Sequence, residues 1–197
     1  MSVYPGAQFL FSAAAAAQFP PDEGTEIALA GRSNAGKSSA LNAITARRAL
    51  ARTSKTPGRT RLLNFFQLAP GVRLIDLPGY GYADGPPAER DDWARLIEAL
   101  ATRAAVRGLL LLVDARRGLL PGDQQLLAWA EGLQWAVHVL LSKADQLTRA
   151  EGQRLLARTR TALAARASVQ LFSARSGVGI DEARATLDGW LTKKVPR

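Results

Sequence analysis

The chain has 197 residues, 47% of them hydrophobic, which suits one domain with a substantial core. It has no cysteine, which excludes disulfides and thiolate metal sites, and its apolar runs fall well short of the roughly 20 residues of a membrane span. The net charge of +9 favours a polyanionic partner such as a nucleic acid.

The N-terminal stretch contains an alanine-rich segment, 13–17, that resembles the apolar part of a signal peptide. No Lys or Arg precedes it, so the basic region of a signal peptide is missing. We therefore expect a cytoplasmic protein that does not bind membranes, and we expect it to be a monomer.

Strand-like and helix-like segments alternate along the rest of the chain. Because the turn 69–71 is too short for a crossover, the strands on either side of it should pair antiparallel, whereas the other strands should be parallel. This predicts an α/β fold with a mostly parallel sheet and helices on both faces. Strands are expected at 27–30, 62–68, 72–75, 108–113, 135–141 and 169–172, with helices at 38–46, near 93–100, after 121, after the 148–151 capping box and at 180–190.

Residues 31–38 read GRSNAGKS, a complete G-x-x-x-x-G-K-S phosphate-binding loop between a strand and a helix. Gly31 and Gly36 let the backbone curl so that successive N–H groups point inward, and the helix N-terminus adds partial positive charge. Lys37 can reach the β- and γ-phosphates, and the Ser38 hydroxyl can bind Mg²⁺. The loop therefore predicts binding of a nucleoside triphosphate.

Asp76-Leu77-Pro78-Gly79 follows the strand at 72–75. The Asp76 carboxylate can hold Mg²⁺ through a water, and the Gly79 N–H can approach a γ-phosphate. Thr60 lies in the basic loop 47–61, where its hydroxyl can bind Mg²⁺ only when the γ-phosphate is present. This arrangement predicts a loop that orders with the triphosphate and relaxes after hydrolysis.

Two further strand ends indicate guanine. Asp145 of Ser142-Lys-Ala-Asp145 can accept from N1–H and the exocyclic amine of guanine, and adenine lacks that pair of donors. The Lys143 stem can lie on the base face. Ser173-Ala174-Arg175 follows the strand at 169–172, where a small residue lets a backbone N–H meet the guanine O6.

Five stretches of the chain together resemble the EngB/YihA/YsxC family of bacterial ribosome-biogenesis GTPases: 31–38, 54–60 (SKTPGRT), 63–66, 76–82 and 142–145. The resemblance implies a three-layer P-loop NTPase fold, a small G-domain with a six-stranded, mostly parallel sheet and one antiparallel edge strand. It implies a single GTP-binding domain over 1–197, with 1–25 as an N-terminal extension packed on it. It also implies Mg²⁺ as cofactor, GTP and GDP as ligands, a precursor of the large (50S) ribosomal subunit as partner through its rRNA and proteins, and a tie to cell division and septation.

The resemblance also implies residue roles. Lys37, Thr60 and Asn34 are the expected catalytic residues, and Ser38 and Thr60 the expected metal ligands. The expected GTP-binding residues are Gly31, Arg32, Ser33, Asn34, Ala35, Gly36, Lys37, Ser38, Ser39, Gly58, Arg59, Thr60, Arg61, Leu62, Asp76, Leu77, Pro78, Gly79, Ser142, Lys143, Ala144, Asp145, Phe172, Ser173 and Ala174.

Some positions depart from commoner GTPases. Tyr80 stands where many GTPases place a water-orienting glutamine, which predicts slow intrinsic hydrolysis accelerated by a partner. The rings of Tyr80 and Tyr82 either stack on RNA bases or pack on a neighbouring helix. Asn34 matches the position that helps hold K⁺ in related GTPases, so K⁺ is a second expected ion. Ser142 replaces the commoner asparagine, and loss of the amide would loosen the bracing between loops.

Two other functions compete with that of a GTP switch. A small P-loop kinase of nucleotides or metabolites has no use for Asp145 after a strand. An RNA-binding module with a vestigial loop is opposed by five intact residues: Lys37, Ser38, Thr60, Asp76 and Asp145. His138, the only histidine, lies in an apolar strand and is expected to be a core residue rather than a base.

Overall fold

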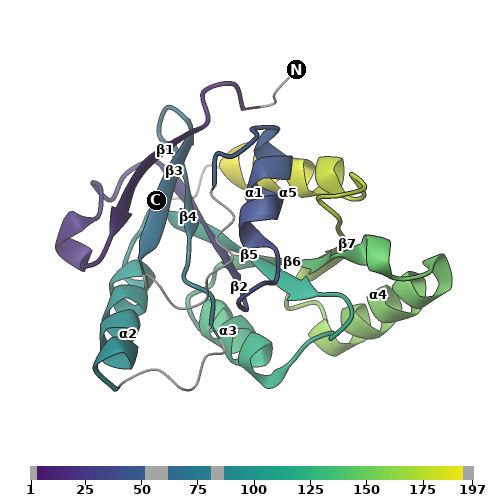
Figure 1. Cartoon of the computed structure of the whole chain (residues 1–197). Helices are drawn as coiled ribbons and strands as arrows, with labels where there is room; N and C mark the ends of the chain where they lie inside the picture. The colour runs from purple at the N-terminus through teal and green to yellow at the C-terminus, as the bar shows by residue number, and fades with distance from the viewer. Residues whose placement is uncertain (1–3, 52–61, 81–86, 193–197) are drawn as a thin grey trace.

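A computed structural model describes residues 4–51, 62–80 and 87–192. Within these segments seven strands form one sheet in the order β1-β3-β4-β2-β5-β6-β7 (Figure 1). The strands are β1 (Gln8–Ala13), β2 (Thr25–Gly31), β3 (Leu63–Ala69), β4 (Val72–Asp76), β5 (Val106–Asp114), β6 (Ala136–Ser142) and β7 (Ser168–Leu171).

The sheet is mixed, as predicted, but it has one strand more than the six expected. Strands β2, β4, β5, β6 and β7 are parallel, whereas β3 pairs antiparallel with both β4 and β1. Strand β1 lies in the segment expected to be an extension without a strand. Phe11 stacks on Phe65 at 5.1 Å and Phe9 meets Phe66 edge-on at 5.5 Å. Both phenylalanines belong to β1, so these cross-strand aromatic contacts help to hold the strand against β3.

The helices cover both faces of the sheet (Figure 1). Helices α1 and α5 pack on one face, and α2, α3 and α4 pack on the other. None of the described helices is both long and apolar enough to cross a bilayer. The elements are α1 (Lys37–Thr45), α2 (Pro87–Ala101), α3 (Pro121–Gly132), α4 (Arg149–Leu163) and α5 (Ile180–Thr192), with short 3-10 turns at Ala16–Gln18 and Ala144–Gln146.

The core is centred on β5, whose side chains from Leu109 to Leu112 are fully buried. This explains why that strand is a continuous apolar run rather than an alternating one. His138 on β6 is buried as expected of a core residue. Its Nδ1 lies 2.6 Å from Ser168 Oγ and its Nε2 lies 2.8 Å from Gln170 Oε1.

Two polar features fix the boundaries of elements. The predicted capping box starts α4, because the Glu151 carboxylate accepts from Thr148 N–H at 2.8 Å and the Thr148 hydroxyl accepts from Glu151 N–H. At the start of β2 the fully buried Glu26 accepts from Arg73 and Arg103, and both arginines also donate to carbonyls of residues 20–23. A buried carboxylate with two cationic partners thus ties the segment before β2 to the sheet.

Candidate nucleotide-binding site

The functional motifs meet at one edge of the sheet, where the parallel strands end. The phosphate-binding loop follows β2, Asp76 ends β4, Asp114 ends β5, and Ser142 ends β6. In open parallel sheets ligands bind outside the carboxyl ends of the strands. The strand register places Asp114 beside Ser142 and Asp76 beside Leu29, so these residues belong to one continuous site.

The phosphate-binding loop has the backbone of an anion nest. Gly36 has φ +98°, a value that suits glycine, and Asn34 has φ +63°. The N–H groups of Asn34, Gly36, Lys37 and Ser38 find no acceptor among the described residues. Donors that converge at the start of a nine-residue helix form a site for a phosphate.

Two charged groups lie beside this nest. The Lys37 ammonium is 3.5 Å from the Gly31 carbonyl, and it exerts an attraction on the Asp76 carboxylate. Burial raises the pKa of Asp76 to about 6, an effect that Lys37 and a hydrogen bond from Asn64 oppose. Asp76 Oδ1 is buried and has no hydrogen-bond partner within the described segments.

This buried oxygen tests whether the residues suit Mg²⁺. A carboxylate oxygen without a partner, in a carboxyl group that interacts with Lys37 at the start of α1, is the kind of hard donor that Mg²⁺ prefers. The described segments hold no cluster of three or more His, Asp or Glu side chains that could bind a metal. Mg²⁺ in nucleotide sites uses one or two protein ligands together with phosphates and waters, so the donor set fits.

The segment that follows Asp76, which contains Gly79 and Tyr80, lies directly against the phosphate-binding loop. Ser33 N–H donates to the Tyr80 carbonyl at 3.4 Å, and Arg32 and Tyr80 form an isolated parallel bridge. A Cβ on Gly79 would stand 3.0 Å from the Ser33 backbone. Glycine is therefore needed here for close approach, in agreement with the expected position of this residue near the phosphates.

The Tyr80 side chain packs on α3. Its hydroxyl donates to Asp123 Oδ1 at 2.5 Å, and its ring lies where a Cβ on Gly122 would be 3.5 Å away. Burial and the Asp123 carboxylate raise the pKa of Tyr80 far above its ordinary value. The sequence left open whether the ring stacks on RNA bases or packs on a helix, and in the structure it packs on α3. Tyr82 lies outside the described residues.

A cavity of about 610 Å³ lies between α1, β6 and β7, and it is lined by the loops expected to hold the guanine base. The Ser173 hydroxyl donates to Asp145 Oδ1 at 2.6 Å and accepts from the N–H groups of Arg175 and Ser176. The Ala174 N–H has no acceptor among the described residues, which leaves it available for a carbonyl such as guanine O6. Phe172 is buried beneath this loop.

Ser142 does brace the loops, contrary to the loosening expected from the missing asparagine. Its hydroxyl donates to the Ala35 carbonyl at 2.7 Å and also lies 3.2 Å from the Val113 carbonyl. A hydroxyl suffices because the β6 end lies close to the phosphate-binding loop. The brace thus uses one donor where an amide would offer two.

Sequence reasoning missed Asp114. The Lys143 ammonium donates to Asp114 Oδ2 at 2.8 Å and to the Asn34 carbonyl at 2.7 Å, while Lys143 holds φ +60°. Arg116 donates to both Asp114 oxygens, and this hydrogen bonding holds the Asp114 pKa well below its usual range. The only signal in the sequence was an aspartate directly after the apolar run 108–113.

The structure brings together most, but not all, of the predicted residues. Gly58, Arg59, Thr60 and Arg61 lie outside the described residues, and Leu62 stands just before β3. The Leu77 side chain is buried, and its N–H donates to Leu29. The Asn34 side chain is exposed. The residues that the structure describes at the nest and base loops are Gly31, Arg32, Ser33, Asn34, Ala35, Gly36, Lys37, Ser38, Ser39, Asp76, Pro78, Gly79, Ser142, Lys143, Ala144, Asp145, Phe172, Ser173 and Ala174.

A mixed α/β sheet with this nest, a buried aspartate beside it and a carboxylate over the base cavity defines a P-loop GTPase. The family model for the 50S ribosome-binding GTPase matches residues 26–143. A probable GTP-binding protein EngB of Coxiella burnetii is 44% identical over 195 residues, which cover 97% of this chain and 95% of that protein. The corresponding protein of Nitrosococcus oceani is 48% identical over 194 residues, covering 96% and 97%. The chain therefore belongs to the EngB family of GTP-binding proteins and is a GTPase.

Solved structures share this fold. A crystal structure of a probable GTP-binding protein EngB has a TM-score of 0.68 and 22% identity, and covers 86% of this chain and 100% of that chain. Era in complex with MgGDPNP and part of 16S ribosomal RNA has a TM-score of 0.66 and 20% identity, and covers 89% and 59%. The family assignment leaves the small-kinase alternative without support.

Proposed function

We propose that this GTPase is a slowly hydrolysing switch that serves assembly of the large ribosomal subunit. The family description as a 50S ribosome-binding GTPase and the net charge of +9 support a ribosomal partner. The structural neighbour Era is described in complex with ribosomal RNA, which is the same class of partner.

We infer a role for each residue of the site. The unpaired N–H groups of Asn34, Gly36, Lys37 and Ser38 cradle the phosphates, and Lys37 swings from the Gly31 carbonyl to the β- and γ-phosphates. Asp145, oriented by Ser173, accepts from guanine, while the Lys143 stem covers the base. Ser38 and Thr60, with Asp76 through water, would hold Mg²⁺. When bound, this ion neutralises charge on the β- and γ-phosphates.

The position of Tyr80 is the main observation that supports slow intrinsic GTP hydrolysis. Its side chain is held by Asp123 on the far side of the phosphate-binding loop from the base cavity. A phenol held there does not supply the amide that orients the attacking water in many GTPases. Rapid turnover therefore needs a group from outside, which supports activation by a partner.

Nucleotide choice is tested by replacing Asp145 with asparagine. Reversal of the hydrogen-bond polarity should weaken GDP binding roughly a hundredfold or more and should strengthen xanthosine diphosphate binding. Asp181→Asn, a change at an exposed residue of α5, is the matched control and should leave both affinities unchanged. Retention of guanine binding by Asp145→Asn would contradict the assignment of this residue.

The partner is tested by cosedimentation of the protein with large-subunit particles. Binding should be stronger with a nonhydrolysable GTP analogue than with GDP, because the switch loops depend on the γ-phosphate. GTP turnover should rise when particles are added. Equal sedimentation in both nucleotide states, without any rise in turnover, would contradict a switch acting on this partner.

A further inference from the structure

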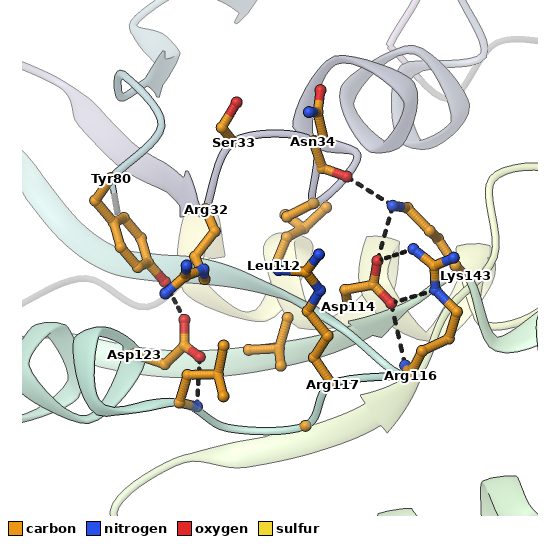
Figure 2. Close-up of a pocket in the computed structure, with 14 residues that line it drawn as sticks. Arg32, Ser33, Asn34, Tyr80, Leu112, Asp114, Arg116, Arg117, Asp123 and Lys143 are labelled. Atoms are coloured by element: carbon orange, nitrogen blue, oxygen red, sulfur yellow. Dashed lines mark hydrogen bonds and ion pairs between the residues drawn. The ribbon is translucent and has the colours of Figure 1, made fainter. Parts of the chain in front are cut away.

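A second cavity lies on the opposite side of the phosphate-binding loop from the base cavity. It measures about 220 Å³ and is enclosed by residues 32–35, the loop after β5 and the start of α3 (Figure 2). Tyr80 and Asp123 close one end, and Lys143 and Asp114 close the other (Figure 2). Its lining includes residues of the phosphate-binding loop and Lys143, but the phosphate, base and Mg²⁺ roles proposed above place no ligand in this space.

The lining of this cavity carries excess positive charge. Its charged residues are four cations and two carboxylates: Arg32, Arg116, Arg117, Lys143, Asp114 and Asp123.

Both carboxylates are already engaged. Asp123 is 1% exposed and accepts from the Tyr80 hydroxyl and from Leu120 N–H, while Asp114 accepts from Arg116 and Lys143.

Two guanidinium groups remain available. Within the described segments Arg32 and Arg117 have neither an ion pair nor a side-chain hydrogen bond. Figure 2 shows the Arg32 side chain beside Tyr80 and Asp123, whereas Arg117 projects from the loop after β5 between that end and Asp114. Two fork-shaped donors that face a concave space of net positive charge form a binding site for an oxyanion.

We propose that this cavity binds a phosphate group of an RNA strand, a proposal that rests on the ribosomal partner proposed above. The basic surface continues beyond the cavity, which is what a strand with repeated phosphates requires. The Arg158 guanidinium of α4 lies 3.9 Å from the point where a Cβ on Gly118 would stand. One turn earlier Arg154 is also exposed. The only acid of α4, Glu151, is engaged with Thr148.

An acidic protein segment fits this surface less well. A single carboxylate could occupy the cavity, but the arginines along α4 would then find no partner. A strand of RNA places one charge on every nucleotide, so it can engage the cavity and α4 together. The continuity of positive charge from Arg117 to Arg158 therefore favours RNA.

Arg117 is the residue on which the test is built, because it is exposed and has no proposed role in nucleotide binding. Arg117→Gln should weaken binding of a fluorescent single-stranded RNA about tenfold, as expected for loss of one charged hydrogen-bond pair. The slope of log affinity against log salt should fall by about 0.7. Arg117→Lys should lose less affinity and keep the slope, because the charge remains. The control Arg107→Gln, at the opposite end of β5, should bind RNA as the native protein does.

Competitors identify the ligand. Inorganic phosphate at constant ionic strength should displace the RNA from the native protein more effectively than from Arg117→Gln. Unchanged RNA affinity and slope in Arg117→Gln would overturn the proposal. It would also be overturned if an acidic peptide, but not RNA, lost affinity in that variant, because the site would then belong to a protein partner.

The same variants separate this proposal from the proposed function. All of them should bind GDP as tightly as the native protein. If native protein and Arg117→Gln cosediment equally with large-subunit particles, only the RNA site is refuted. If the native protein does not cosediment in any nucleotide state, the proposed function fails as well.

Discussion

Replacing Asp76 with asparagine should make the nucleotide-free protein more stable at neutral pH, although it removes a residue of the site. Burial raises the pKa of this carboxyl from 3.8 to about 6, and its Oδ1 has no partner among the described residues. At about 1.4 kcal/mol per pKa unit, the ionised side chain costs about 3 kcal/mol of folding free energy. Asparagine has a similar shape and does not pay this electrostatic cost.

The sign of the pH dependence follows from the folded pKa being above the unfolded one. The contribution of Asp76 to stability is fully present below pH 3.8 and is lost as the pH rises through about 6. The advantage of Asp76→Asn should therefore be about 3 kcal/mol at pH 7.5 and should shrink to about 1 kcal/mol at pH 4.5. Urea unfolding in the presence of EDTA, without nucleotide, measures both values.

The exposed Asp181 provides the matched control. Asp181→Asn should change the free energy of unfolding by less than about 0.5 kcal/mol, because a surface ion pair contributes little. Asp76→Asn should also lose the Mg²⁺-dependent part of its GTP affinity. If Asp76→Asn is less stable than the native protein at pH 7.5, or if its advantage does not depend on pH, burial is not what perturbs this carboxyl.

Three other outcomes follow from the contacts. Ser142→Ala removes the donor to the Ala35 carbonyl, so it should cost about 1 kcal/mol of stability and speed GDP release in stopped-flow assays; unchanged release would show that this brace is dispensable. Burial lowers the pKa of His138, so this contribution to stability is present above pH 6.5 and is lost as the pH falls through the lowered pKa; NMR titration of the sole histidine should find its pKa below 6.5. K⁺ should stimulate hydrolysis more than Na⁺ does, and Asn34→Ala should abolish the difference; equal rates in both salts would remove the K⁺ hypothesis.

Periodicity and motif spacing were sufficient for most of the fold. The apolar run of β5 and the short turn before β4 gave the parallel and antiparallel parts of the sheet, because burial on both faces and loop length leave little choice. Strand β1 could not be recognised in the same way. Its pairing depends on contacts of Phe9 and Phe11 with β3, which lies about fifty residues later in the chain.

In the site, too, local motifs could be predicted from the sequence and long-range contacts could not. Phosphate and base motifs were recognisable because glycine, lysine and aspartate must stand at fixed spacings to do their chemistry. The partners of these motifs were not recognisable. Asp114 reaches Lys143, and Asp123 reaches Tyr80, across 29 and 43 residues of sequence, and only the meeting of strand ends makes them neighbours.

We expect the two cavities to be coupled because they share a wall. Ala35 and Lys143 line both of them, and the Lys143 ammonium is bonded to Asn34 of the loop and to Asp114 in the second cavity. An anion that attracts Arg116 or Lys143 competes with Asp114 for these cations and so alters the support of the base-covering stem. Linkage requires the reverse as well: whichever nucleotide favours the anion must bind more tightly when the anion is present, by the same factor. Measuring GTP and GDP affinities with and without saturating RNA would reveal this factor, and identical affinities would mean that the shared wall is rigid.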